Sequence, residues 1–192
     1  MLSKRSTKVA ILILAIIGVL YISGYRFTGE QAARAFFTVD KNSKYMTEVD
    51  YDWGTVYLFD TPEGPRTVIA EKKSFLWVAR TGFHLEKSED GIQTMGWAID
   101  ERCTVIALKV IDPDVSFIDA GDGNFRKRMH INGEEMIIFS WTAAVDWQRL
   151  NGIAYSGDGE ILYEYRYPHS NVIHMKDLKW HPYEGDALES EN

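Results

Sequence analysis

Three histidines near the C-terminus, His169, His174 and His181, are the first residues whose types could do chemistry, and Asp177 lies among them. A zinc site needs three or four converging ligands, and helical spacings of three or four residues bring such ligands together. These histidines are instead separated by five and seven residues in a segment bounded by prolines. The spacing therefore favours surface or partly packed histidines over a metal centre, and we predict no cofactor.

Acidic turns and serines offer a second kind of chemistry. The segments 112–114 and 119–124 contain aspartates that could bind calcium, but their spacing matches no EF-hand loop, and Asp, Asn and Gly are ordinary turn residues. Ser156 lacks the preceding glycine of a nucleophile elbow. We therefore name no catalytic residue and predict that the protein is not an enzyme. A cell-envelope hydrolase with dispersed acidic residues is the alternative.

Tyrosines alternate along the segment 161–167. Tyr163, Tyr165 and Tyr167 occupy every second position, and such residues lie on one face of a strand. The row of rings could stack on sugars, or it could pack against the C-terminal segment 178–183. Both uses stay open from the sequence, and burial is the more common one.

Basic residues alternate along the segment 125–131, where Arg126, Arg128 and His130 share one face of a predicted strand. A row of cations on an acidic domain could bind wall polymers or lipid phosphates. A solvated strand face is the simpler interpretation. We name Arg126 and Arg128, with the three tyrosines, as candidate binding residues.

The elements that must position these residues begin with an apolar segment. Seventeen uncharged residues, 9–25, lie between Lys8 and Arg26. A helix of that length is about 25 Å long, close to the ~30 Å of a bilayer's hydrocarbon core. We predict a membrane span that includes Val9, Ile22 and Gly24. A cleaved signal peptide and a buried soluble helix are the alternatives.

Charges around the apolar segment predict its orientation. Lys4, Arg5 and Lys8 precede it, whereas Arg26 is followed closely by Glu30. Because basic residues favour the cytoplasmic side, we expect a single-pass protein of the cell membrane with a cytoplasmic N-terminus. The lipid bilayer is then a partner, and the folded domain is extracytoplasmic.

The remaining sequence predicts a mainly β domain. Thr28 and Gln31 have the spacing of a capping box, which predicts a short helix over 29–37. Three hairpins are expected: one joins 55–60 to 66–72, one joins 125–131 to 135–141 across Asn132-Gly133, and one joins 152–156 to 160–167 across residues 157–159. About ten short strands at spacings of 8 to 12 residues predict an antiparallel β-sandwich or open barrel.

These elements divide the chain into four parts. We assign residues 1–25 to the cytoplasmic tip and transmembrane signal anchor, 26–44 to the short helix and connector, 45–183 to the β-rich extracytoplasmic domain, and 184–192 to an acidic flexible tail.

Composition limits the partners. The chain has 192 residues, of which 45% are hydrophobic and 26% charged, as is typical of a globular protein. Since three of its 21 basic residues precede the domain and all 28 acidic residues follow Tyr25, the folded part carries a net charge of −10. Such a charge disfavours nucleic acid as a partner. Cys103 is the only cysteine and is expected to pack as a small hydrophobe.

The stretch "DWGTVYLFDTPEGPRTVIAEKKSFLWVAR", with "INGEEMIIFSW" and "NGIAYSGDGEILYEY" after it, resembles an uncharacterised family of small signal-anchored extracytoplasmic proteins of Gram-positive bacteria. The resemblance covers residues 52–167 and implies the compartment and the β fold, with no catalytic residues to transfer. We therefore expect a membrane-anchored module for binding, sensing or an accessory role at the cell envelope. Its further partner would be a wall polymer or another membrane protein.

Overall fold

The computed structural model describes residues 4–133, 136–145, 149–166 and 179–184. Antiparallel sheets dominate this part of the chain, so the predicted mainly β class is confirmed. The helices are α1 (Lys4–Ile22), α2 (Gly29–Arg34) and the short 3₁₀ turn η1 (Gly123–Phe125). The strands are β1 (Lys44–Tyr51), β2 (Gly54–Asp60), β3 (Arg66–Lys73), β4 (Leu76–His84), β5 (Ile92–Asp100), β6 (Cys103–Val110), β7 (Phe117–Ala120), β8 (Lys127–His130), β9 (Met136–Trp141), β10 (Ile153–Tyr155), β11 (Ile161–Arg166) and β12 (Lys179–Pro182).

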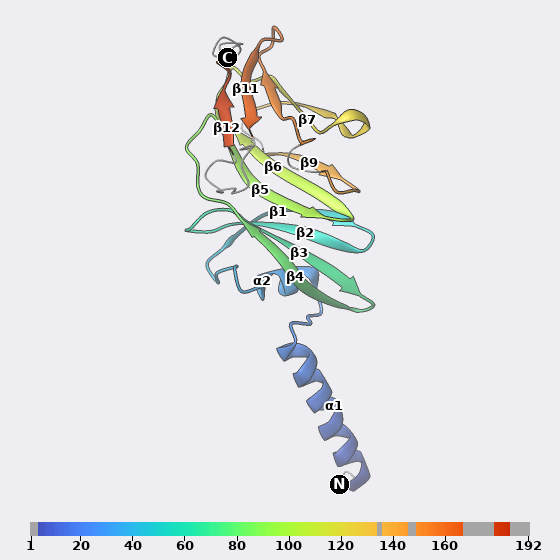
Figure 1. Ribbon diagram of the computed structural model, residues 1–192. Coiled ribbons are helices and arrows are strands. Elements are labelled where there is room, and N and C mark those ends of the chain that lie inside the picture. Colours follow the sequence, from blue (N-terminus) through green and yellow to red (C-terminus); the bar gives the residue numbers. More distant parts are fainter. Residues whose placement is uncertain (1–3, 134–135, 146–148, 167–178, 185–192) are drawn as a thin grey trace, which may run out of the picture.

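The strands form three sheets that lie one above the other (Figure 1). The proximal sheet, nearest α1, has the order β1-β2-β3-β4. The middle sheet has the order β5-β6-β9, and the distal sheet has the order β12-β11-β10-β7-β8. The structure thus extends a sandwich of two sheets by a third sheet.

The proximal sheet is covered on both faces. On β2, Val56 and Leu58 pack toward the middle sheet, whereas Tyr57 and Phe59 pack toward α2. All four side chains are buried because successive residues of a strand point to opposite faces and each face has a cover. β2 therefore lacks the alternation of buried and exposed residues that marks a sheet with one wet face.

The middle sheet repeats this arrangement one layer further from α1. On β6, Val105 and Ala107 pack toward the proximal sheet, whereas Ile106 and Leu108 pack toward the distal sheet. Cys103 is fully buried in the first of these cores. Its expected packing as a small hydrophobe is confirmed, and burial raises the pKa of its thiol to about 11.

The helix that follows the connector is shorter than predicted. The Thr28 hydroxyl accepts a hydrogen bond from the Gln31 backbone N–H at 3.2 Å, which confirms the helix start. α2 ends at Arg34, whereas the sequence predicts an end at residue 37. The backbone N–H of Phe36 donates to the Ala33 carbonyl in a tightened last turn, and Phe36 packs into the core between α2 and the proximal sheet.

Two of the three expected hairpins form, and β10 pairs with β11 as predicted. β2 and β3 pair across residues 61–65, as predicted. The hairpin across Asn132-Gly133 is wrong, because β8 pairs with β7 in the distal sheet while β9 pairs with β6 in the middle sheet. The reason is that alternate residues of β9 are buried in the core between these two sheets.

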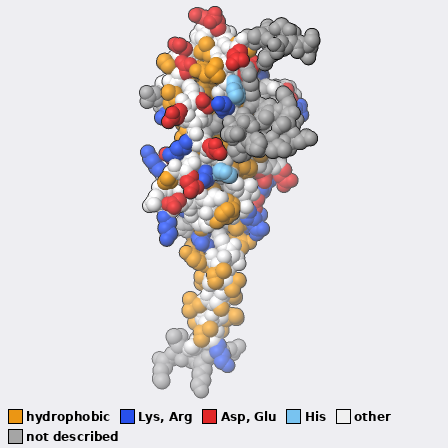
Figure 2. Space-filling model, turned by 60° about the vertical axis from the view of Figure 1, so that its left-hand side comes forward, with side chains coloured by type: hydrophobic (Ala, Val, Ile, Leu, Met, Phe, Trp, Pro, Cys, Tyr) orange, Lys and Arg blue, Asp and Glu red, His pale blue; other side chains and the backbone are white. Residues whose placement is uncertain are grey.

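α1 projects from the proximal end of the domain (Figure 1), and hydrophobic side chains are spread along its length (Figure 2). The large apolar side chains of α1 are 48% to 86% exposed at Val9, Ile11, Leu12, Ile13, Leu14, Ile16, Ile17, Val19, Tyr21 and Ile22. Within the described part of the chain, no helix is both long enough and apolar enough to span a membrane.

A glycine and an arginine end α1. The Tyr25 N–H donates to the Leu20 carbonyl and the Gly24 N–H donates to the Tyr21 carbonyl, with Gly24 at a φ of +87°. This pattern is a Schellman motif, which needs a residue in the left-handed region. The sequence predicts Gly24 inside the apolar helix, whereas the structure places it in the cap. The Arg26 guanidinium donates to the carbonyls of Tyr21 and Tyr25, at 2.8 Å each.

Candidate functional site

A polar pocket of about 490 Å³ opens at one end of the proximal sheet. Three segments line it: residues 37–42 after α2, the β2–β3 turn, and the paired ends of β3 and β4. Its lining includes Phe37, Thr38, Asp40, Asn42, Glu63, Arg66 and His84. It is the first candidate for a ligand site, because convergent polar groups in a concave surface are typical of such sites.

Arg66 is the buried charge of this pocket. It is only 7% exposed, and it begins β3 opposite His84 of β4. Its guanidinium donates to the Glu63 carboxylate at 2.9 Å, and the Glu63 side chain is 84% exposed. A buried guanidinium needs an anionic or carbonyl partner. Here the guanidinium also donates to the Pro65 carbonyl at 3.4 Å, and its anionic partner is a surface side chain that a ligand can displace.

The β2–β3 turn fixes this geometry. Gly64 has a φ of +137°, and a Cβ at that position would lie 2.2 Å from the Leu85 carbonyl oxygen. Only glycine allows both the backbone conformation and this close approach. The Thr61 hydroxyl also donates to the Gly64 carbonyl at 2.7 Å. The turn is therefore held against the end of β4, with Glu63 and Arg66 on either side of Gly64.

The segment after α2 contributes the other wall. Thr38 Oγ1 is buried without a hydrogen-bond partner within the described residues. The Asp40 carboxylate accepts from the Asn42 backbone N–H at 2.6 Å, and Phe37 is 88% exposed. The pocket thus combines hydrogen-bonding groups, a buried cation, the carboxylates of Asp40 and Glu63, and an exposed ring. This chemistry suits reversible binding of a polar ligand that carries a negative charge.

The tyrosine row does not form an exposed stripe. Tyr165 is buried, with its ring centroid 6.2 Å from Trp97 and 5.6 Å from Trp180. Tyr163 is half-buried, and its hydroxyl donates to the Asp112 carboxylate at 2.7 Å, which raises the pKa of the phenol to about 12. Tyr167 lies outside the described residues. A sugar-stacking role is therefore wrong for Tyr165, whose ring is core.

The arginine row is brought together on the distal sheet. Arg128 donates two hydrogen bonds to the Asp119 carboxylate, at 2.7 and 2.8 Å, and Arg126 lies 3.8 Å from the same carboxylate. The Arg128 guanidinium also lies 4.2 Å from the centre of the Phe117 ring, which stacks on Tyr155 at 4.8 Å. Half of the Arg128 side chain is exposed, but its charge is already paired. The row is therefore less cationic than the sequence suggests.

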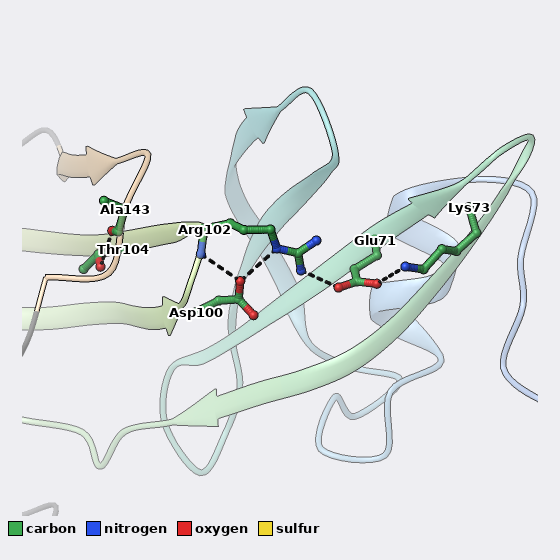
Figure 3. A network of polar contacts seen from close by, with 6 residues as sticks. All are labelled: Glu71, Lys73, Asp100, Arg102, Thr104 and Ala143. Carbon is green, nitrogen blue, oxygen red and sulfur yellow. Dashed lines mark hydrogen bonds and ion pairs between the residues drawn. The ribbon is translucent and has the colours of Figure 1, made fainter.

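A second polar network joins the proximal and middle sheets (Figure 3). Arg102, in the β5–β6 turn, pairs with Asp100 at 3.0 Å and with Glu71 of β3 at 2.5 Å. Glu71 also pairs with Lys73 at 2.6 Å, and hydrogen bonds from these two cations lower the pKa of the Glu71 carboxyl. The Arg102 guanidinium lies 3.9 Å from the centre of the Trp53 ring. The network holds two layers together and leaves its charges balanced.

Most of the C-terminal segment that contains the three histidines lies outside the described residues. His169, His174 and Asp177 are not among the described residues, and His181 lies on β12. Within the described ranges, no group of three His, Cys, Asp or Glu side chains is placed to hold a metal ion.

Sequence reasoning missed the pocket. The segment "TPEGPR" indicates a turn, and an arginine that begins a strand is expected to be exposed. A glycine between two prolines signals an unusual backbone conformation, but nothing in the sequence shows that residues 37–42 fold over Arg66.

Comparisons with known proteins identify no family for this chain. No protein-family model matches the chain, and no match was found among the curated proteins or the solved structures.

Proposed function

We propose that the protein is a membrane-anchored binding module, in which α1 enters a lipid bilayer and the stacked sheets present a ligand site. The observation that carries this proposal is the apolar surface of α1. Its exposed residues occupy every side of the helix, not one stripe. A helix that is apolar all round is stable in an apolar environment, such as a protein core or a membrane.

The ends of α1 support a bilayer over a protein core as that environment. Lys8 precedes the apolar segment, Tyr21 and Tyr25 lie near its C-terminal end, and Arg26 follows it. Tyrosine and arginine are typical of the interface between lipid and water. Arg26 lies over the Tyr21 ring at 3.9 Å. Because the basic N-terminal residues favour the cytoplasm, the domain is proposed to face outward. The resemblance to signal-anchored proteins agrees with this compartment and stays a prediction.

The proposed ligand site is the pocket around Arg66, and the proposed ligand is an anionic polymer of the cell envelope. An anionic group of the ligand would replace Glu63 at the buried guanidinium, while Asn42 and His84 would bind neighbouring polar groups. Arg126 and Arg128 form the second candidate for such a contact, weakened by their shared partner Asp119.

Membrane attachment is tested on cells that express the full chain with a C-terminal tag. We expect full-length protein in the membrane fraction, resistant to carbonate extraction, with the domain digested when protease is added to wall-free cells. A shortened product in the medium would instead identify residues 1–25 as a cleaved signal, and protection from protease would place the domain inside. Either result would overturn the proposal.

Ligand binding is tested by sedimentation of the detergent-solubilised full chain with insoluble cell-wall polymer. Glu63→Gln is expected to strengthen binding, because it frees the buried Arg66 charge for the ligand, and Arg66→Gln is expected to abolish it. Asp158→Asn, in an exposed distal turn, serves as the matched loss of one negative charge. Equal gains for Glu63→Gln and Asp158→Asn would show that net charge acts alone, and the pocket would then be rejected as the site.

A further inference from the structure

We infer that the domain has a second lipid contact beside α1: the β3–β4 hairpin tip and the α1–α2 connector bind the surface of an anionic bilayer. This surface consists of Phe27, Lys72, Lys73 and Phe75, and we call it the basal patch. The inference rests on the proposed membrane insertion of α1, and it adds what fixes the orientation of the domain on the membrane.

Exposed aromatic rings mark the basal patch. Phe27 is 72% exposed and Phe75 is 74% exposed, whereas most large apolar side chains of the sheets are buried. Ser74 and Phe75 form the two-residue turn between the paired residues Lys73 and Leu76, and Ser74 has a φ of +61°. Exposed rings of this kind are typical of contact surfaces when they lie together.

The backbone brings these two rings to the end of α1. Arg26 and Trp77 exchange two backbone hydrogen bonds of 2.8 Å, which join the connector to the edge strand β4. Phe27 follows Arg26 directly, and Phe75 precedes Trp77 by two residues. The basal patch therefore lies at the level where α1 ends, at the proximal end of the domain (Figure 1). A bilayer entered by α1 has its interface at that level.

The charges of the patch suit an anionic surface. Lys72 is exposed, and half of the Lys73 side chain is exposed. Residues 71–75 contain one acidic and two basic side chains, and because Lys73 is paired with Glu71, Lys72 supplies the net positive charge of the hairpin tip. The folded part as a whole is acidic, and an anionic membrane therefore repels most of the domain but attracts this end.

These features favour lipid over a protein as the occupant. The patch is continuous with the apolar surface of α1 at Arg26, and it combines aromatic rings with lysines, as interfacial membrane segments do. The patch holds two rings and two cations, which suits shallow insertion among lipid headgroups.

The test uses the full chain in vesicles of phosphatidylcholine, alone or mixed with phosphatidylglycerol. A Phe75→Cys variant is labelled with an environment-sensitive fluorophore, and quenching by spin-labelled lipids is measured. Phe125→Cys is the matched control, because Phe125 is also an exposed phenylalanine but lies in η1, beside the distal sheet. The unsubstituted chain checks that the buried Cys103 takes up no label.

We expect several-fold stronger quenching at position 75 than at position 125 in mixed vesicles, with a blue-shifted emission. The double variant Lys72→Gln/Lys73→Gln, carrying the same label at position 75, should lose most of this difference. Equal quenching at both positions would overturn the inference. So would quenching at position 75 that changes neither with the two lysine substitutions nor with the removal of phosphatidylglycerol. Flotation of the same vesicles measures separately whether α1 attaches the protein to the bilayer. If the protein floats but the label at position 75 is not quenched, the basal patch alone is refuted. If the protein fails to float, the anchor is refuted.

Discussion

α1 and β6 are both rich in aliphatic residues, yet the aliphatic side chains of β6 are buried and most of those of α1 are exposed. On β6, Val105 through Leu108 are buried on both faces of the middle sheet. On α1, Leu12 and Leu14 are more than half exposed. The difference lies in the cover: β6 has a sheet above and a sheet below, whereas the described residues leave α1 open on all sides.

This contrast separates two sources of stability. Burial of β6 stabilises the fold, because about 25 cal/mol is gained for each Å² of apolar surface removed from water. The large apolar side chains of α1 that are exposed gain nothing of this kind from the described part of the domain, and we propose lipid as their environment. Substitutions in the two elements should therefore act on different measurements.

The largest expected effect is on α1. The double variant Leu12→Asp/Ile16→Asp should lose membrane association by tenfold or more, because a charge near the centre of a membrane helix costs about 3 kcal/mol. Flotation with vesicles measures this loss, and thermal unfolding should give an unchanged midpoint. Leu12→Ala/Ile16→Ala is the matched control. If the aspartates instead lower the unfolding midpoint, α1 packs on protein and the comparison fails.

The next effect is on β6. Leu108→Ala should lower the free energy of unfolding by about 2–5 kcal/mol, the usual cost of a cavity at a fully buried leucine. Urea denaturation followed by tryptophan fluorescence measures it. Leu14→Ala on α1 removes the same atoms from an exposed position and should leave the denaturation curve where it was. Equal losses for the two variants would contradict the assigned burial.

Thiol reactivity sharpens the comparison without altering packing. Cys103 should react with a chromogenic disulfide reagent only after unfolding, because its thiol is buried and its raised pKa of about 11 reduces the thiolate near neutral pH. A Leu14→Cys variant should add one rapidly reacting thiol. Fast reaction of the unsubstituted protein in native buffer would show that the core around β6 opens readily.

The smallest effect concerns the distal sheet, where the Asp119 carboxylate accepts hydrogen bonds from Arg128. Hydrogen bonds from Arg128 lower the pKa of the Asp119 carboxyl, so its contribution is present above the unfolded-state pKa and is lost as pH falls through the lower folded pKa. Urea midpoints should therefore fall more steeply on acidification, below about pH 4, for the wild type than for Asp119→Asn. Asp158→Asn is the surface control. Parallel curves for wild type and Asp119→Asn would show that this pair does not stabilise the fold.

Local elements were predictable because their signals are short in sequence. The capping box at Thr28 located the start of α2, and the turn residues 61–65 located the β2–β3 hairpin. The pairing of β10 with β11 likewise agrees with the glycines at 157 and 159. Each of these features depends on hydrogen bonds between residues that are close in the chain.

Pairing between distant segments was not predictable in the same way. Asn132-Gly133 has the composition of a hairpin turn, yet β8 and β9 enter different sheets because their apolar faces find different partners. The candidate site shows the same limit. The alternation of tyrosines predicts Tyr165 as a possible binding residue, but tryptophans of β5 and β12 pack against its ring and it is buried.

The sequence by itself determined the mainly β class, the acidic domain charge, the apolar segment before Arg26 and the local turns, since composition and short-range spacing fix these properties. Only the tertiary structure decided that three sheets stack, that Arg128 forms an ion pair with Asp119, and that Arg66 lies buried in a pocket. The physical reason is that burial and pairing are contacts between segments far apart in the chain. A side chain's type says what it can do, but its neighbours decide whether it packs, pairs or stays free to bind.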